Sequence, residues 1–315
     1  MDVLPSWRAG PTRTAVLEFL AAARDVPVEQ RVAYFDNDGT LWCERPSYVQ
    51  WDFLVDQLRQ RATEDPSIAQ QPEFAAVLEA RREAIASIGL ARIAVALAGL
   101  FTGLTPEEFA GRVRGWMATA VHASGRPVRS LGYRPMRELI ELLRADGFTV
   151  GIVTGGGAEF LRAISGELYG VPPDRVVGTS VGYRLTGGDR GTVVLRRTAR
   201  IVGDANEGAA KVTNAQTQLG RRPILAAGNS AGDAELLRWA TAAPGPGLAL
   251  LLDHDDAERE YAYEGRAETF TAAEAVGDTA ARLGWTRISM ARDWATVFDT
   301  DTDTDTDTDT GTSGR

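Results

Sequence analysis

The chain of 315 residues has few of the residue types on which several classes of site depend. It contains one cysteine, Cys43, which excludes an intrachain disulfide and a zinc–cysteine site. Its two histidines, His122 and His254, are too few for most histidine-based metal centres. Of the 34 basic residues only Lys211 is a lysine, and its compact ammonium group is not equivalent to a guanidinium group.

Long apolar runs and an excess of positive charge are also missing. No apolar run approaches the roughly 20 residues that a membrane span needs, and the N-terminus lacks the layout of a signal peptide. The net charge of −9 would repel a nucleic acid or an anionic membrane surface. These absences predict a cytoplasmic protein without a nucleic-acid or membrane partner, and they leave its oligomeric state open.

Short apolar runs alternate with amphipathic stretches along most of the chain. Four runs, each followed by small or polar residues, are the clearest predicted strands: 31–35, 148–153, 223–227 and 248–252. Their uninterrupted apolar character suits a parallel sheet that is covered on both faces. Residues 136–145 have helical spacing and lead directly into the second run, as in a crossover unit. The pattern predicts an α/β fold with a doubly wound parallel sheet.

The region after the first predicted strand has a different pattern. Three stretches have helical periodicity and no run is typical of a strand: 49–61, 73–86 and 105–120. Proline and two glutamates after Thr105 indicate a capped helix start, and the apolar stretch 85–101 is expected to be a buried helix. We therefore predict a helical cap domain inserted into the core. The alternative is that these helices only cover a face of the sheet.

The predicted domain organisation follows from these patterns. Residues 1–45 and 131–298 form the core, and residues 46–130 form the cap. Residues 299–315, mostly an alternating Asp-Thr repeat, have nothing apolar to bury and are predicted to be a disordered tail.

Two carboxylates, Asp36 and Asp38, follow the first predicted strand at a spacing of two residues. The chain turns there on Gly39, so both side chains can converge above the edge of the sheet. Such a pair can hold a divalent cation, and it can divide the roles of nucleophile and general acid. The alternative is an ordinary turn, because Asp-Asn-Asp-Gly is favourable turn sequence in any protein.

Three further segments carry chemistry at predicted strand ends. Thr154 and the glycines that follow it precede a predicted helix over 158–169, an arrangement that favours an anion. Asn229 and Asp233 would bring an amide oxygen and a carboxylate to the edge that carries Asp36, and oxygen ligands suit Mg²⁺. Lys211 would then neutralise charge between a nucleophilic carboxylate and a phosphoryl group.

The order of these segments resembles the haloacid dehalogenase-like superfamily of phosphohydrolases, in its phosphoserine-phosphatase-like branch with a helical C1-type cap. FDNDGTLW corresponds to the first motif, VTGGG to the second, Lys211 to the third and GNSAGD to the fourth. The resemblance extends from Leu4 to Phe298, and the phrases LPSW, YGVPPDRVVG and HDDAEREYAY resemble a bacterial subgroup. It implies a Rossmann-like core with the cap inserted after the first motif.

The resemblance also implies a role for each motif residue. Asp36 would be the nucleophile that becomes an aspartyl phosphate, and Asp38 would be the acid and base, with its backbone carbonyl as a metal ligand. Lys211 would hold the nucleophile and the phosphate together. The phosphate oxygens would be bound by Thr154, Gly155 and Gly156.

The metal site departs from the commonest pattern of that branch. Asp36, Asp38, Asn229 and Asp233 would bind Mg²⁺, directly or through water. Phosphoserine phosphatases have an aspartate where Asn229 stands, and a neutral amide oxygen binds Mg²⁺ more weakly than a carboxylate. Asp233 is therefore the alternative direct ligand, and the metal affinity is expected to be modest.

The predicted function is a Mg²⁺-dependent phosphomonoester hydrolase that acts on a small phosphorylated metabolite. A dehalogenase is disfavoured, because a leaving halide needs no proton and Asp38 would have no role. A phosphomutase or phosphotransferase of the same superfamily is the first alternative. A catalytically weak phosphate-binding regulatory protein is the second.

Substrate recognition is expected in the cap and beside the first motif. Glu44 is a candidate contact for a cationic or hydroxyl-rich group, and the alternative is a surface glutamate paired with Arg45. Trp42, with Tyr48 and Trp51, is expected either to line an apolar lid or to pack between cap and core. His254 follows a predicted strand and lies either at the active edge or in a solvated loop.

Overall fold

The computed structural model describes residues 3–266, 270 and 272–299. Its centre is an 8-stranded sheet with the order β4-β3-β2-β1-β5-β6-β7, in which β8 also pairs with β6. The strands are β1 (Val32–Phe35), β2 (Thr149–Gly157), β3 (Val176–Gly187), β4 (Val193–Val202), β5 (Leu225–Gly228), β6 (Leu248–Asp255), β7 (Ala262–Tyr263) and β8 (Thr286–Ser289).

The core of the sheet is parallel. β1 pairs in parallel with β2 and β5, and β5, β6 and β8 continue the parallel arrangement. Among the strands of the described residues, β4 and β7 are the two that run antiparallel to a neighbour. The carboxyl ends of β1, β2 and β5 therefore lie at one edge, where the predicted motif segments begin.

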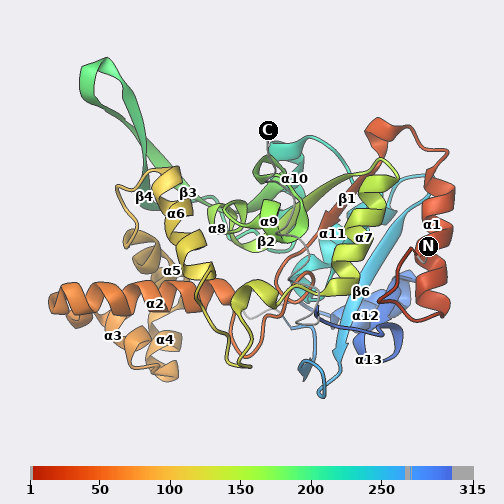
Figure 1. Ribbon diagram of the computed structural model, residues 1–315, viewed down its shortest axis with the longest axis horizontal. Helices are drawn as coiled ribbons and strands as arrows, with labels where there is room; N and C mark the ends of the chain where they lie inside the picture. Colours follow the sequence, from red (N-terminus) through yellow and green to blue (C-terminus); the bar gives the residue numbers. More distant parts are fainter. Residues whose placement is uncertain (1–2, 267–269, 271, 300–315) are drawn as a thin grey trace, which may run out of the picture.

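Helices cover both faces of this sheet (Figure 1). Alternate residues of β1 enter two separate buried clusters: Phe35 packs with the cluster of α1 and α7, and Tyr34 with the cluster of α10, α11 and α12. The core helices are α1 (Pro11–Ala23), α7 (Arg134–Ala145), α8 (Ala158–Arg162), α9 (Ser165–Tyr169), α10 (Ala209–Leu219), α11 (Ala234–Thr241), α12 (Val276–Leu283) and α13 (Met290–Asp293). The predicted doubly wound α/β fold is confirmed.

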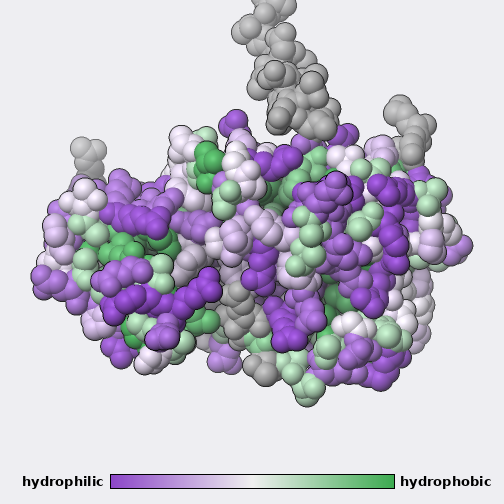
Figure 2. Space-filling model, turned by 90° about the horizontal axis from the view of Figure 1, so that it is seen from below, coloured by the Kyte–Doolittle hydropathy of each residue, from purple (hydrophilic) through white to green (hydrophobic). Residues whose placement is uncertain are grey.

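A helical insertion lies between β1 and β2, at the left of Figure 1. Its helices are α2 (Val49–Glu64), α3 (Pro72–Leu78), α4 (Arg82–Ile88), α5 (Leu90–Gly99) and α6 (Pro106–Met117). It has a buried cluster of its own, which includes Leu58, Phe74 and Leu97. Thr105 caps α6 in a capping box with Glu108, as its sequence predicts. In Figure 2 an apolar area is exposed among polar side chains on this left-hand side.

Three predicted helices are interrupted. The helix expected over 73–86 is broken at Ala80, which has a φ of 50°, and the stretch 85–101 is broken at Gly89, with a φ of 91°. α5 buries Ile93 and Leu97 but leaves Leu90 and Val95 more than 40% exposed, so the expectation of a buried helix is wrong for half of its surface. The helix expected over 158–169 divides into α8 and α9.

The antiparallel hairpin of β3 and β4 was not expected from the sequence. It extends from the sheet towards the insertion, as the green hairpin in Figure 1 shows. The backbone of Arg197 in β4 donates to Leu104 and accepts from Gly103, which lies between α5 and α6. The hairpin therefore connects the core sheet to the cap helices.

Of the predicted tail 299–315, only Asp299 is described, and residues 300–315 lie outside the described residues. Within the described part, no helix has both the length and the apolar character that crossing a membrane would require.

Candidate active site

A pocket of about 200 Å³ lies between the carboxyl edge of the sheet and helix α2 of the cap. Its wall includes Asp36, Asp38, Lys211 and Asn229 from the core, together with Tyr48 and Trp51 from the cap side. The backbone of Asp36 still donates to Ala227 of β5, so the chain leaves the sheet just after this residue. Residues from distant parts of the sequence thus meet at one site.

Lys211 lies between two buried carboxylates. Its Nζ is 2.6 Å from Asp36 Oδ1 and 2.6 Å from Asp233 Oδ1, and all three residues are at most 5% exposed. Burial lowers the pKa of Lys211, but the charges of Asp233 and Asp36 outweigh burial and hold the pKa well above its ordinary value. Lys211 therefore remains an ammonium group, at a place where a larger guanidinium group would need more room.

Negative charge exceeds positive charge around Asp36. Burial raises the pKa of Asp36 well above its ordinary value, Asp233 adds to the increase, and Lys211 opposes it. Asp36, Asp38 and Asp233 face Lys211 as the one nearby ammonium, so full ionisation would leave two uncompensated negative charges. A divalent cation would compensate them.

Asp38 is held by two donors. The Trp42 indole Nε1 donates to Oδ1 at 2.9 Å, and the Thr154 hydroxyl donates to Oδ2 at 3.3 Å. Burial raises the pKa of Asp38, and the Trp42 hydrogen bond and Lys211 reduce that increase. A carboxyl group in these surroundings can both give and take a proton.

One carboxylate oxygen of Asp36 and the amide oxygen of Asn229 lie near the same hydroxyl group, that of Thr40. Thr40 Oγ1 is 3.3 Å from Asp36 Oδ2 and 3.4 Å from Asn229 Oδ1, so each oxygen receives only a long hydrogen bond from this hydroxyl. Asp233, in contrast, makes shorter hydrogen bonds within the protein: Oδ1 accepts from Lys211, and Oδ2 accepts from the backbone of Asn229 and Ser230. This donor set fits a hard cation at Asp36 and Asn229 better than at Asp233.

Side-chain carboxylates alone do not complete such a site. Among the described residues, no group of three or more His, Cys, Asp or Glu side chains is arranged to hold a metal ion. A metal bound here would depend on the Asn229 amide oxygen and on main-chain oxygen such as the Asp38 carbonyl.

The predicted phosphate loop differs from the expected helix N-terminus. Its glycines continue β2 as far as Gly157, and α8 that follows has only 5 residues, too few for a strong helix dipole. The Gly156 amide donates to Thr154 Oγ1 at 3.0 Å, and the Gly157 amide donates to Gln50 Oε1 at 2.7 Å. A Cβ at Gly156 would lie 2.9 Å from Gln50 Oε1, so a larger residue there would require the Gln50 side chain to move.

The two candidate substrate contacts lie in different environments. Glu44 lines the pocket, is 7% exposed, and accepts from Asn229 Nδ2 at 3.0 Å, so it is not a surface residue. Burial raises the pKa of Glu44 to about 7, although His254 opposes the increase. Trp42 is 1% exposed and packs beneath the pocket, where it holds Asp38 rather than lining the wall.

Several residues of the site carried no recognisable sequence signal. Gln50 is the second residue of α2, and its side chain accepts a hydrogen bond from the Gly157 amide of the phosphate loop, 107 positions away. Glu207 also lines the pocket, against Gly155 and Gly232, where a Cβ would lie 2.0 Å and 2.1 Å from its carboxylate oxygens. Buried Asn206 donates to the carbonyl of Thr154 at 2.8 Å. No periodicity or motif marks these residues.

The fold and the pocket define a class of protein with a doubly wound α/β core and a helical insertion over the carboxyl ends of its strands. Residues 33–238 match the family described as haloacid dehalogenase-like hydrolase. The chain belongs to this family.

Two solved structures with TM-scores above 0.5 have a similar fold at low sequence identity, and a third matches with a lower score. A protein of unknown function from Bordetella pertussis Tohama I matches with a TM-score of 0.53 and 19% identity, over 82% of this chain and 98% of that one. A functionally unknown protein from Anaerococcus prevotii matches with a TM-score of 0.56 and 14% identity, over 91% and 94%. A phosphoserine phosphohydrolase-like protein from Francisella tularensis matches at 0.36 and 14%, over 80% and 99%. No curated protein matches the chain.

Proposed function

We propose that this protein is a Mg²⁺-dependent phosphomonoester hydrolase that acts on a small phosphorylated metabolite through an aspartyl phosphate on Asp36. The observation that carries the proposal is the contact of Lys211 Nζ with Asp36 Oδ1 at 2.6 Å, beside Asn229 Oδ1 and Asp38 in one pocket. A buried ammonium group at a carboxylate can stabilise the charge of a phosphoryl group as it is transferred. Membership of the hydrolase family supports the same reaction class.

In the first step, an Asp36 carboxylate oxygen attacks phosphorus. The bond from phosphorus to the leaving oxygen breaks, and Asp38 gives its proton to that oxygen. Thr154 and Trp42 hold Asp38 by its two oxygens, so its carboxyl group is oriented before the reaction. The products of this step are the free alcohol and the aspartyl phosphate.

In the second step, water hydrolyses the aspartyl phosphate. Asp38, now ionised, takes a proton from water, whose oxygen attacks phosphorus and breaks the bond to Asp36. Inorganic phosphate leaves and Asp38 is protonated again. Mg²⁺, held by Asp36, Asn229 and the Asp38 carbonyl, would neutralise phosphate charge and orient the phosphoryl group.

Hydrolysis of p-nitrophenyl phosphate, with Mg²⁺ or with a chelator, tests the reaction. Activity should require the metal and should be lost in Asp36→Asn, but not in the exposed control Asp25→Asn. Because p-nitrophenolate leaves without a proton, Asp38→Asn should still form the aspartyl phosphate and should hydrolyse it slowly. Mass spectrometry would then find a phosphoryl group on Asp36, and its absence from an active enzyme would rule out the covalent route.

A phosphate-binding protein with little activity is the second candidate, because the neutral Asn229 amide stands beside Asp36. Tight binding of inorganic phosphate with no turnover in Mg²⁺ would favour it. Turnover that appears only when an acceptor alcohol is added would instead indicate a phosphotransferase.

A further inference from the structure

The segment 254–263, HDDAEREYAY, has no role in the proposed reaction, although it folds directly behind the first motif. His254 lies near the end of β6 and is 5% exposed. β7 returns antiparallel to β6, which places Tyr263 opposite His254, and the two rings stack with centroids 4.2 Å apart. The segment therefore holds the His254 ring in a fixed orientation.

His254 contacts the turn that carries the two catalytic aspartates. Its Nε2 is 2.7 Å from the carbonyl oxygen of Gly39. A carbonyl oxygen can only accept, so Nε2 carries a proton and donates to Gly39. The other ring nitrogen, Nδ1, is 3.2 Å from Glu260 Oε2.

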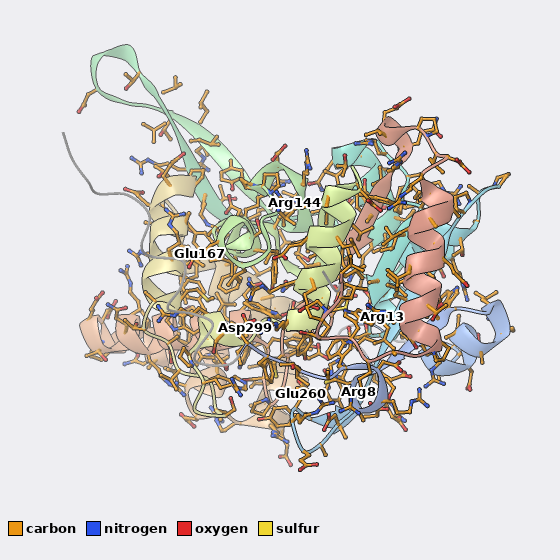
Figure 3. The ribbon with its side chains drawn as sticks, turned by 45° about the vertical axis from the view of Figure 1, so that its right-hand side comes forward. Arg8, Arg13, Arg144, Glu167, Glu260 and Asp299 are labelled. Carbon is orange, nitrogen blue, oxygen red and sulfur yellow. The ribbon has the colours of Figure 1, made fainter. Side chains whose placement is uncertain are left out.

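Glu260 is itself held by other donors. The Tyr133 hydroxyl donates to Oε1 at 2.9 Å, and the Tyr261 backbone amide donates to Oε2 at 2.6 Å. Burial raises the pKa of Glu260, but the hydrogen bond and charge of His254 outweigh burial and hold the pKa below its ordinary value. Glu260 therefore faces Nδ1 as a carboxylate, and this contact orients the ring so that Nε2 faces the Gly39 carbonyl. Figure 3 labels Glu260 below the start of α7, where Tyr133 precedes the helix.

The Gly39 peptide has little freedom of its own. Gly39 has a φ of 72°, and a Cβ there would lie 2.0 Å from Asn229 Nδ2. Its amide donates to Trp42 O at 2.9 Å, and the next residue, Thr40, donates to Asp36 and Asn229. The direction of the Gly39 carbonyl thus sets the direction of the residues on both sides of it.

We propose that His254 is a positioning residue: the hydrogen-bond chain from Tyr133 through Glu260 and His254 to the Gly39 carbonyl fixes the turn that carries Asp38. This inference rests on the proposed function of that turn. Of the described residues that line the 200 Å³ pocket, none belongs to this chain of three side chains, so none of the three side chains touches a substrate bound there. Outer partners of this kind commonly change activity 10- to 100-fold when removed.

The test compares His254→Ala with His254→Gln in p-nitrophenyl phosphate hydrolysis. His254→Ala should lower kcat about 10- to 100-fold with a smaller change in KM, because the pocket wall is intact while Asp38 is misaligned. His254→Gln can still donate an amide proton to the Gly39 carbonyl and should recover part of kcat. A role that is only structural would lower stability in both variants and leave kcat per folded molecule unchanged.

A second pair of variants keeps the test decisive if His254→Ala does not fold. Glu260→Gln retains the shape of the side chain but loses the charge that orients His254, and it should lower kcat in the same way. Glu258→Gln is the matched control, because Glu258 is exposed on the same segment. The double variant of His254 and Glu260 should lose less than the product of the two single losses, because both act through one chain.

An independent readout does not need activity. The chain has 2 histidines, so the ring N–H signals in an NMR spectrum can be assigned by comparing the protein with His254→Gln. A protected Nε2 proton on His254 is expected, and its absence would overturn the inference. Wild-type protein without hydrolysis would contradict the proposed function instead, whereas active wild type with unchanged kcat in Glu260→Gln and His254→Ala would contradict only this inference.

Discussion

Asp233 Oδ1 lies 2.6 Å from Nζ of Lys211, and its Oδ2 accepts from two backbone amides, so this aspartate supports the lysine and only its Oδ1 retains acceptor capacity. The motif order alone left either Asn229 or Asp233 as the direct ligand. The hydrogen bonds favour Asn229, because its Oδ1 lies with Asp36 Oδ2 around the Thr40 hydroxyl.

Replacing Lys211 should affect both stability and activity. Lys211→Met leaves Asp36 and Asp233 buried without their cation, and breaking a buried ion pair of this kind costs about 3–5 kcal/mol. Urea unfolding near neutral pH should show this loss. Lys211→Arg keeps the charge. Lys211 is only 1% exposed, however, and the larger planar guanidinium group does not fit in its place, so kcat should also fall. Full activity in Lys211→Arg would contradict the role assigned to the compact ammonium group.

Asn229→Asp should lower the Mg²⁺ concentration needed for half-maximal activity, because a carboxylate replaces an amide oxygen at the expected ligand position. The change also removes the donor to Glu44 and places two carboxylates side by side. The double variant Asn229→Asp, Glu44→Gln restores a donor at that contact and should bind Mg²⁺ more tightly still. Titration of Mg²⁺ by calorimetry measures this directly. Unchanged affinity in both variants would exclude Asn229 as a ligand.

Glu44 should make the metal-free protein less stable as the pH rises. Burial raises the pKa of Glu44 from 4.5 to about 7 in the folded state, so folding favours the protonated form. The stability that this proton provides is complete below pH 4.5 and is lost as the pH rises to about 7. Glu44→Gln should therefore gain stability relative to wild type between pH 5 and pH 8, in urea unfolding with a chelator. The exposed control Glu83→Gln should show no such trend.

The same variant tests recognition. If Glu44 reads a cationic or hydroxyl-rich part of the substrate, Glu44→Gln should lower kcat/KM for phosphorylated amines more than for simple phosphomonoesters. Equal effects on both groups of substrates would show that Glu44 does not recognise this part of the substrate and acts only through its contact with Asn229.

Arg197 should stabilise the junction between the hairpin, the cap and the core. It forms an ion pair with Glu159 of α8, and its guanidinium carbon lies 3.8 Å from the centre of the Phe109 ring of α6. Arg197→Ala leaves the partly buried Glu159 without this partner and removes the contact with Phe109, so it should lower the free energy of unfolding measured in urea. Arg200→Ala, exposed on the same strand, is the matched control and should change stability little. Adding Glu159→Gln to Arg197→Ala should restore part of the loss.

The parts of the fold that sequence patterns predict are those with local causes. β1, β5 and β6 are continuous apolar runs, and the motif residues follow strand ends, so their meeting at one edge follows from parallel pairing. The helices of the cap are also predicted by a local pattern, their helical periodicity. Their breaks at Ala80 and Gly89 depend on single residues with positive φ, which periodicity does not report.

The parts that were missed depend on contacts between distant residues. β3 and β4 contain glycine, arginine and exposed apolar residues, because much of the hairpin packs on neither face of the core. Gln50 reaches the Gly157 amide across 107 positions, and no local pattern encodes that distance. His254 had two open interpretations until its bond to Gly39, 215 positions away, placed it at the active edge.

An inserted domain that is attached to the core only by the two linkers where the chain enters and leaves it can rotate about those linkers. Here β4 provides a third attachment, through the backbone of Arg197 at Gly103 and Leu104. Any movement that uncovers the pocket must carry the hairpin along or break these bonds. Exchange of the whole insertion for that of a relative would therefore need the matching hairpin as well.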